Sequence, residues 1–77
     1  MNPICIVDDE SSICSIVASI LQDEGYHCVI FPDAESFWRK RDTVEPSLVM
    51  LDIWLPGTDG LQLLKRLHGR FPALPII

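Results

Sequence analysis

Basic residues are scarce in this sequence, and the shortage limits what the chain binds. There are six Lys and Arg against eleven Asp and Glu, which gives a formal net charge of −5. Such a surface is poorly suited to neutralise phosphates, so we expect no nucleic-acid interface. The one basic run, from Arg39 to Arg41, is typical of a solvated helix end.

Long apolar runs are also missing. No stretch approaches the roughly 20 apolar residues that a membrane-spanning helix needs. The N-terminus reaches Asp8, Asp9 and Glu10 almost at once, without the basic and apolar regions of a signal peptide. We therefore expect a cytoplasmic protein with no membrane attachment.

Cysteines are few, odd in number and not arranged as metal ligands. Cys5, Cys14 and Cys28 show no CxxC spacing, which argues against a zinc site. We expect three reduced thiols that act mainly as small core residues.

The sequence does contain a regular alternation of apolar strands and amphipathic helices. The 77 residues, 48% of them hydrophobic, allow one small globular domain and argue against disorder. Gly25, Pro32, Pro46 and Pro72 mark the boundaries between segments, and Asp33 is a predicted helix N-cap. The expected elements are, in order, strand 4–7, helix 11–24, strand 26–31, a short helix from 33, strand 48–51, helix 59–69 and strand 74–77.

This order predicts an α/β fold with a doubly wound, parallel sheet, because strand–helix–strand crossovers are right-handed. Helical spacing predicts the buried side of each long helix. For the first helix the predicted side comprises Ile13, Ile16, Val17, Ile20 and Leu21. For the third, which Asp59 and Gln62 open as in a capping box, it comprises Leu61, Leu64, Leu67 and Phe71.

Two predicted strands end in acidic residues. "ICIV" leads into Asp8, Asp9 and Glu10, and "LVML" leads into Asp52. Ligands of such sheets bind at the carboxyl ends of the strands. Carboxylates gathered there repel one another unless a hard cation such as Mg²⁺ neutralises them. The sequence therefore predicts an acidic pocket for Mg²⁺ and a phosphoryl group.

Simpler interpretations exist for each acid. Asp8, Asp9 and Glu10 suit the first turn of a helix, where the macrodipole favours negative charge, and Glu10 in particular fits that role. Asp52 alone could cap a turn. The combination of Asp52 with Asp8 and Asp9 in a doubly wound sheet favours the pocket.

The segments "ICIVDDE", "LVMLDIWLPGTDG" and "PALPII" together resemble the receiver domain of two-component response regulators, in order and over essentially all 77 residues. The loop "DIWLPGTDGL" is similar to receivers of the nitrogen-regulation type, whose full-length members carry an ATPase and a DNA-binding domain. The resemblance implies a CheY-like fold and a signalling domain, with no enzyme activity beyond its own phosphotransfer and dephosphorylation.

The resemblance also implies roles for individual residues. Asp52 matches the phosphoacceptor, which takes a phosphoryl group from a sensor histidine kinase and switches an output, most often transcription. Asp9 matches the principal ligand of Mg²⁺, or of another divalent cation such as Mn²⁺. Asp8 matches an acid that either binds the cation directly or contacts it through the ligands around it. Trp54 matches the residue whose backbone carbonyl binds the metal, and Pro56 and Gly60 match residues that shape the following loop.

Two functional residues of the family have no counterpart here. The family places a Ser or Thr after its fourth strand and a Lys after its fifth, whereas this sequence stops at Ile77. The resemblance thus predicts that residues 1–77 form a receiver lacking the fifth strand and last two helices. Such a receiver has an exposed sheet edge, so we expect it either to be marginally stable alone or to be completed by self-association through that edge.

Two enzyme-like or metal-binding alternatives fit poorly. Haloacid-dehalogenase-like phosphatases need a second Asp two residues after the nucleophile, where this sequence has Trp54. An EF-hand loop starting at Asp52 would have Trp54, Pro56 and Leu63 at ligand positions. A receiver-like interaction or assembly fragment that works without phosphorylation remains the open alternative.

Overall fold

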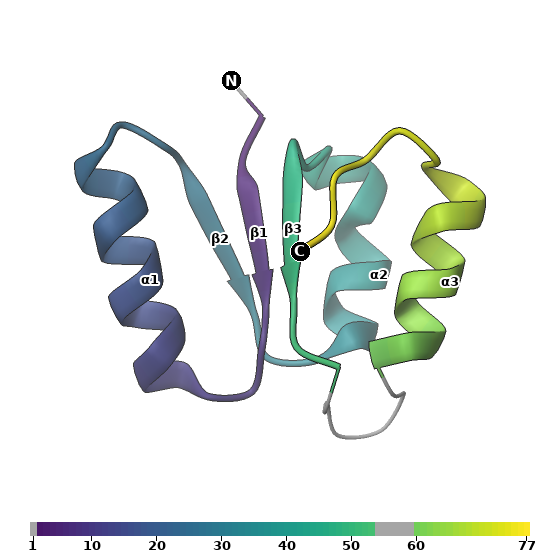
Figure 1. Cartoon of the computed structure of the whole chain (residues 1–77), viewed down its shortest axis with the longest axis horizontal. Helices are drawn as coiled ribbons and strands as arrows, with labels where there is room; N and C mark the ends of the chain where they lie inside the picture. The colour runs from purple at the N-terminus through teal and green to yellow at the C-terminus, as the bar shows by residue number, and fades with distance from the viewer. Residues whose placement is uncertain (1, 54–59) are drawn as a thin grey trace.

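The computed structural model describes residues 2–53 and 60–77. Three parallel strands form a sheet in the order β2-β1-β3, with β1 in the centre. Helix α1 covers one face of this sheet, and α2 and α3 lie side by side on the other (Figure 1). The elements are β1 (Ile4–Val7), α1 (Ser11–Asp23), β2 (Cys28–Phe31), α2 (Ala34–Val44), β3 (Leu48–Leu51) and α3 (Gly60–Arg70). The predicted doubly wound α/β architecture is confirmed.

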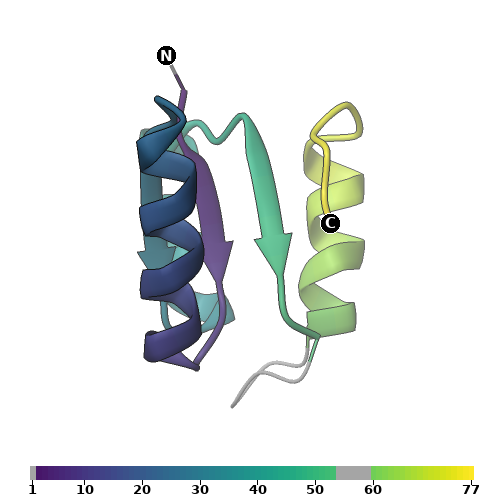
Figure 2. The same ribbon diagram turned by 60° about the vertical axis from the view of Figure 1, so that its left-hand side comes forward.

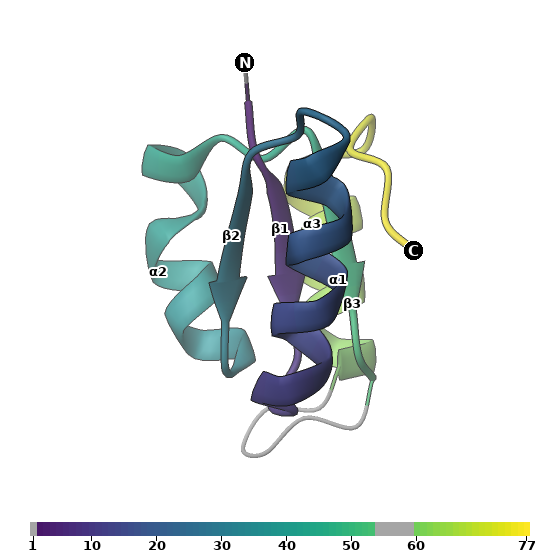
Figure 3. The same cartoon turned by 90° about the vertical axis from the view of Figure 1, so that its left-hand side faces the viewer.

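The sheet separates two apolar clusters because successive side chains of a strand point to opposite faces. Cys5 and Val7 of β1 join the larger cluster, under α2 and α3, where Phe37 packs edge-to-face on Phe31 at 5.4 Å between ring centroids. Ile6 of β1 joins the smaller cluster under α1. In Figure 2 the sheet lies between α1 and α3, and Figure 3 looks onto the face of the sheet that α1 covers. The central strand is buried along its whole length, as its unbroken apolar run predicted.

Local signals set several boundaries as predicted. The carboxylate of Asp33 accepts a hydrogen bond of 2.7 Å from the amide of Ser36, so it caps α2. That hydrogen bond lowers the pKa of Asp33 below its usual range. Gly25 follows α1 with a φ of +92°, a backbone conformation that glycine adopts without a Cβ penalty. Asp59, the predicted first residue of the capping box, lies outside the described residues.

The predicted fourth strand is present only in part. Ile76 forms a single parallel bridge with Val49, flanked by hydrogen bonds from Val49 to Pro75 and from Leu51 to Ile77. Pro75 has no amide hydrogen to donate, which limits the ladder at its start. The segment therefore extends the sheet beyond β3 without making a full strand.

The buried side of α1 differs from the predicted one. Ile13, Ile16 and Ile20 are exposed, whereas Cys14 and Ala18 are buried against the sheet with Val17 packed beside them. The predicted and the observed buried sides of α1 share Val17, so helical spacing alone could not decide which of the two faces the sheet. Small side chains lie underneath because they let the helix approach the sheet closely.

In α3, Leu63 and Leu67 are fully buried, and Leu61 is exposed instead of belonging to the core. Leu64 is half-buried, and Phe71 packs against the larger cluster. The predicted side was therefore right for the later residues and wrong at the first turn. Within the described ranges, no helix has both the length and the apolar character needed to cross a membrane.

We predict that Leu67→Ala lowers the free energy of unfolding by about 2–5 kcal/mol, because it leaves a cavity in the larger cluster. The matched variant Leu61→Ala, on the same helix, should change it by less than about 0.5 kcal/mol. Urea unfolding followed by circular dichroism measures both. Equal losses in the two variants would contradict the burial assigned to α3.

Candidate functional site

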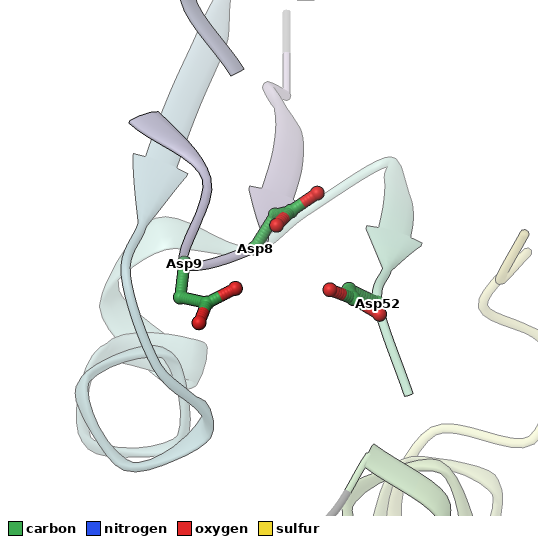
Figure 4. A group of neighbouring side chains, drawn as sticks. All are labelled: Asp8, Asp9 and Asp52. Atoms are coloured by element: carbon green, nitrogen blue, oxygen red, sulfur yellow. The ribbon is translucent and has the colours of Figure 1, made fainter. Parts of the chain in front are cut away.

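Parallel pairing brings the acids of two strands to one edge of the sheet. Val7 is in register with Leu51, and the amide of Asp52 donates to the carbonyl of Val7 at 3.0 Å. Asp8 and Asp52 therefore leave neighbouring strands at the same level, and Asp9 follows on the loop into α1. Figure 4 shows the carboxylates of Asp8, Asp9 and Asp52 facing a common space.

The three carboxylates are close enough to share one cation. A ligand oxygen from each lies within 4.8 Å of the other two. Asp8 and Asp52 are half-buried and Asp9 is exposed. Oxygens on opposite sides of an Mg²⁺ ion are about 4.2 Å apart, since each bond is about 2.1 Å. Small side-chain movements would thus bring these oxygens into one coordination sphere.

The type of donor also fits a hard divalent cation. All three side chains offer oxygen, the ligand that Mg²⁺ and Mn²⁺ prefer, and no thiol or imidazole belongs to this group. Every Lys and Arg of the chain lies in α2 or α3, so the strand ends and the β1–α1 loop supply no basic residue to neutralise the acids. Cation binding would relieve the repulsion among the carboxylates.

Glu10 takes a different role from its neighbours. Its backbone amide donates to the carboxylate of Asp8 at 3.0 Å, which fixes the turn between β1 and α1. Its side chain is exposed at the residue that precedes α1. This placement agrees with the interpretation of Glu10 as an acid at a helix start.

Cys14 is a supporting residue that the sequence did not reveal. Its thiol lies 3.6 Å from the backbone carbonyl of Asp8, to which it donates a weak hydrogen bond. Burial and then the nearby charge of Asp8 raise the pKa of the Cys14 thiol, so it keeps its proton and remains a donor. Its spacing of six residues from Asp8 is not a recognised signature, and only the fold relates the two.

Gly60 lies directly against the backbone that follows Asp52. Its amide donates to the carbonyl of Ile53 at 3.0 Å. A Cβ at Gly60 would lie only 2.3 Å from the Cα of Ile53 and 2.7 Å from the carbonyl oxygen of Asp52. The start of α3 can therefore reach the site only because this residue has no side chain. Trp54 and Pro56 lie outside the described residues, and their roles remain predictions.

Gly60→Ala should lower the free energy of unfolding by about 1–3 kcal/mol, because the added methyl group must push α3 away from residues 52 and 53. Gly69→Ala, in the last turn of α3, is the matched control because its Cβ would meet nothing within 4 Å. There alanine should be neutral or stabilise by up to about 1 kcal/mol, as its helix propensity is higher. Thermal unfolding of both variants measures the difference, and a Gly60→Ala variant as stable as Gly69→Ala would disprove the close approach.

Comparison with known proteins shows which family the chain resembles. Nitrogen assimilation regulatory protein NtrX of Azorhizobium caulinodans is 42% identical over an alignment 78 residues long, which covers 99% of this chain and 17% of that protein. The receiver domain of NtrX from Brucella abortus has a TM-score of 0.88 at 44% identity, covering 95% of this chain and 62% of that one. TrrA of Thermotoga maritima, a response regulator protein solved in complex with Mg²⁺ and BeF, has a TM-score of 0.90 at 32% identity, covering 99% of this chain and 66% of that one.

The chain thus spans less than a fifth of its NtrX relative and about two thirds of these solved receivers. Residues 4–77 match the family described as the response regulator receiver domain. The chain belongs to the receiver domains of two-component response regulators.

Proposed function

We propose that the chain is a phosphoacceptor, in which Asp52 receives a phosphoryl group from a phosphohistidine of a sensor kinase. The observation that carries the proposal is the juxtaposition of Asp52 with Asp8 and Asp9 in a chain of this family. Phosphorylation of Asp52 then switches a downstream output, which we take to be transcription because relatives at 35% and 39% identity are named as transcriptional regulators.

The carboxylates of Asp9 and Asp52 would hold one Mg²⁺ or Mn²⁺ ion, with Asp8 as a further direct or outer ligand. The family resemblance adds the backbone carbonyl of Trp54. When bound, the ion supplies positive charge that offsets the repulsion between a carboxylate and an incoming phosphoryl group. The all-oxygen donor set and the short distances among the three acids support this assignment.

In the proposed transfer, a carboxylate oxygen of Asp52 forms the new bond to phosphorus. The bond between phosphorus and the imidazole nitrogen breaks, its electron pair stays on nitrogen, and the product at Asp52 is an acyl phosphate. The chain's own contribution is positioning: β3 and its pairing with β1 fix the nucleophile, and the Asp8 turn orients its neighbours. The domain is then a signalling switch and performs no further enzyme reaction.

The proposed partner is a histidine kinase that meets this domain in the cytoplasm. TrrA has also been solved in complex with the histidine kinase ThkA, which supports a partner of the same class here. Identities of 42–44% with NtrX proteins favour a nitrogen-regulation type of receiver. The proposal includes self-association through the sheet edge formed by residues 75–77, which pair with β3 on one side.

The first test is phosphorylation in solution. Incubation of the chain with Mg²⁺ and a small phosphodonor such as acetyl phosphate should add one phosphoryl group, detected by mass spectrometry of the intact protein. Asp52→Asn should abolish the gain, because an amide cannot form the acyl phosphate. Asp23→Asn, which removes an exposed acid at the far end of α1, should leave it unchanged. A folded Asp52→Asn variant that still gains the group would refute the proposal.

A second test measures the metal site alone. Asp9→Asn should weaken Mg²⁺ binding by at least about 10–100-fold, the range typical for loss even of an outer-shell partner. Glu10→Gln should have little effect, since that side chain is assigned to the helix start. Isothermal titration with Mg²⁺ and with Mn²⁺ provides both affinities. If Asp9→Asn bound Mg²⁺ as tightly as Glu10→Gln, Asp9 would not be a ligand.

A further inference from the structure

A hollow lies at the end of the sheet opposite the three carboxylates. Its volume is about 790 Å³, and it lies where α2 and α3 end beside the start of β3 (Figure 1). The whole of β3 separates Ser47, on the wall of this hollow, from Asp52, which puts about 16 Å of extended chain between them. The hollow is therefore separate from the acidic site.

The ends of two neighbouring helices and the segments that follow them form its walls. On one side are the last turn of α2 and the connection to β3, and on the other are the last residue of α3 and residues 71–75. Neither Ile76 nor Ile77 is among the lining residues. The volume lies within the range of about 300–1,000 Å³ that is typical of small-molecule sites.

Charges of both signs line this hollow in equal number. Arg41 and Arg70 are the cations, and Asp42 and Glu45 are the anions. Nη2 of Arg70 lies 3.7 Å from Oδ1 of Asp42, across the two helices, and both side chains are more than half exposed. An exposed ion pair of this kind contributes little to stability, so a ligand can insert between the two side chains without unfolding the protein.

Aromatic rings fix the positions of both guanidinium groups. The guanidinium carbon of Arg41 lies 4.0 Å from the centre of the Trp38 ring, and Nη1 of Arg41 donates to the backbone carbonyl of Trp38. The guanidinium carbon of Arg70 lies 5.0 Å from the centre of the Phe71 ring. Guanidinium groups held in this way are pre-organised to bind a carboxylate through paired N–H donors.

The α2 side of the hollow contains two energetically unfavourable features. The Nε atom of Arg41 is buried and has no hydrogen-bond partner among the described residues, a state that is uncommon in native proteins. Glu45 has a φ of 51° and a ψ of 66°, in the left-handed region where residues other than glycine are strained. Such strain concentrates at binding and catalytic sites, and here it turns the chain so that Pro46 and Ser47 line the hollow.

Most of the remaining wall is apolar and includes Pro46, Pro72, Ala73 and Leu74. A ligand that matches the whole wall carries two opposite charges close together and an apolar group attached to them. An α-amino acid has this composition, because its ammonium and carboxylate groups are bonded to the same carbon. A carboxylate without an ammonium group would be repelled by the two acids, and an amine without a carboxylate by the two arginines.

We propose that this hollow binds a zwitterion with an apolar body, of the class of α-amino acids that have branched aliphatic side chains. Its carboxylate contacts the guanidinium groups of Arg41 and Arg70, and its ammonium group contacts the carboxylate of Asp42. The aliphatic side chain lies on the prolines and Leu74. The inference does not depend on phosphorylation of Asp52.

Titration of the isotope-labelled chain with L-leucine, followed by amide NMR, is the first measurement. The amide signals of Ser47, Phe71 and Leu74 should shift and reach saturation at millimolar leucine, which is typical of so small a ligand. The signals of Asp9 and Asp52 should stay where they are. Leucine that shifts none of the first three signals, or that shifts only those of the acidic site, would overturn the proposal.

Analogues of leucine separate the contributions of its groups. Isocaproate is leucine without the ammonium group, isopentylamine is leucine without the carboxylate, and glycine lacks the apolar side chain. Each should bind at least about threefold more weakly than leucine, because each loses one set of contacts. An analogue that binds as tightly as leucine would contradict the proposal, since the group that it lacks would then contribute nothing.

Removal of single charges locates the two polar contacts. Arg70→Gln should weaken the binding of leucine and of isocaproate by about threefold to tenfold, without weakening that of isopentylamine. Asp42→Asn should weaken leucine and isopentylamine by a similar factor, without weakening isocaproate. The matched control is Lys65→Gln, which removes an exposed cation of α3 that is not among the lining residues and should leave all affinities unchanged.

The amide spectrum of each variant also verifies that it is folded. A folded Arg70→Gln or Asp42→Asn variant that binds leucine as the control does would contradict the assigned contacts. The same holds if either variant weakens isocaproate and isopentylamine equally, because each charge would then fail to distinguish the carboxylate from the ammonium group.

Discussion

The in-register parallel pairing of β1 with β3 is the constraint on which the site depends. Val7 and Leu51 are partners, so the residues that follow them emerge at the same level of the sheet. A shift of one residue would send every side chain of a strand to the opposite face. Val49 would then leave the larger cluster, and Asp52 would no longer match Asp8. The burial of the strands and the geometry of the acids are therefore fixed together.

This arrangement adds electrostatic repulsion among carboxylates to a protein with a small hydrophobic core. Three carboxylates meet at the end of a sheet that has three full strands among the described residues. Stability comes instead from the larger cluster, where Phe37, Leu63 and Leu67 are completely buried. The strand ends can then carry mutual repulsion that a cation or a phosphoryl-transfer partner would relieve.

Much of this fold could be predicted from the sequence because its signals are local. The apolar runs of β1 and β3, the Asp33 cap and the turn at Gly25 are determined by a few neighbouring residues, and all are present. The acids of the site were also identifiable, since parallel strands bring their carboxyl ends to one edge. Their functional roles rest on the family to which the chain belongs.

The side of each helix that is buried was not predictable in the same way. In α1 two overlapping sides satisfy helical spacing, and the choice between Ile16 and Cys14 depends on how closely the helix approaches the sheet. The hydrogen bond from Cys14 to the Asp8 carbonyl follows from that choice, as does the exposure of three isoleucines. Tertiary packing, which sequence periodicity does not encode, decided these features.

The absence of a side chain at Gly60 has a mechanical consequence. With the first turn of α3 seated on the backbone of residues 52 and 53, no compressible layer separates the acidic site from this helix. A displacement of that backbone must be passed on to α3, whose Leu63 and Leu67 are embedded in the larger cluster. The close contact at Gly60 would therefore couple a movement of the strand end at Asp52 to the position of α3 and of the leucines that it buries.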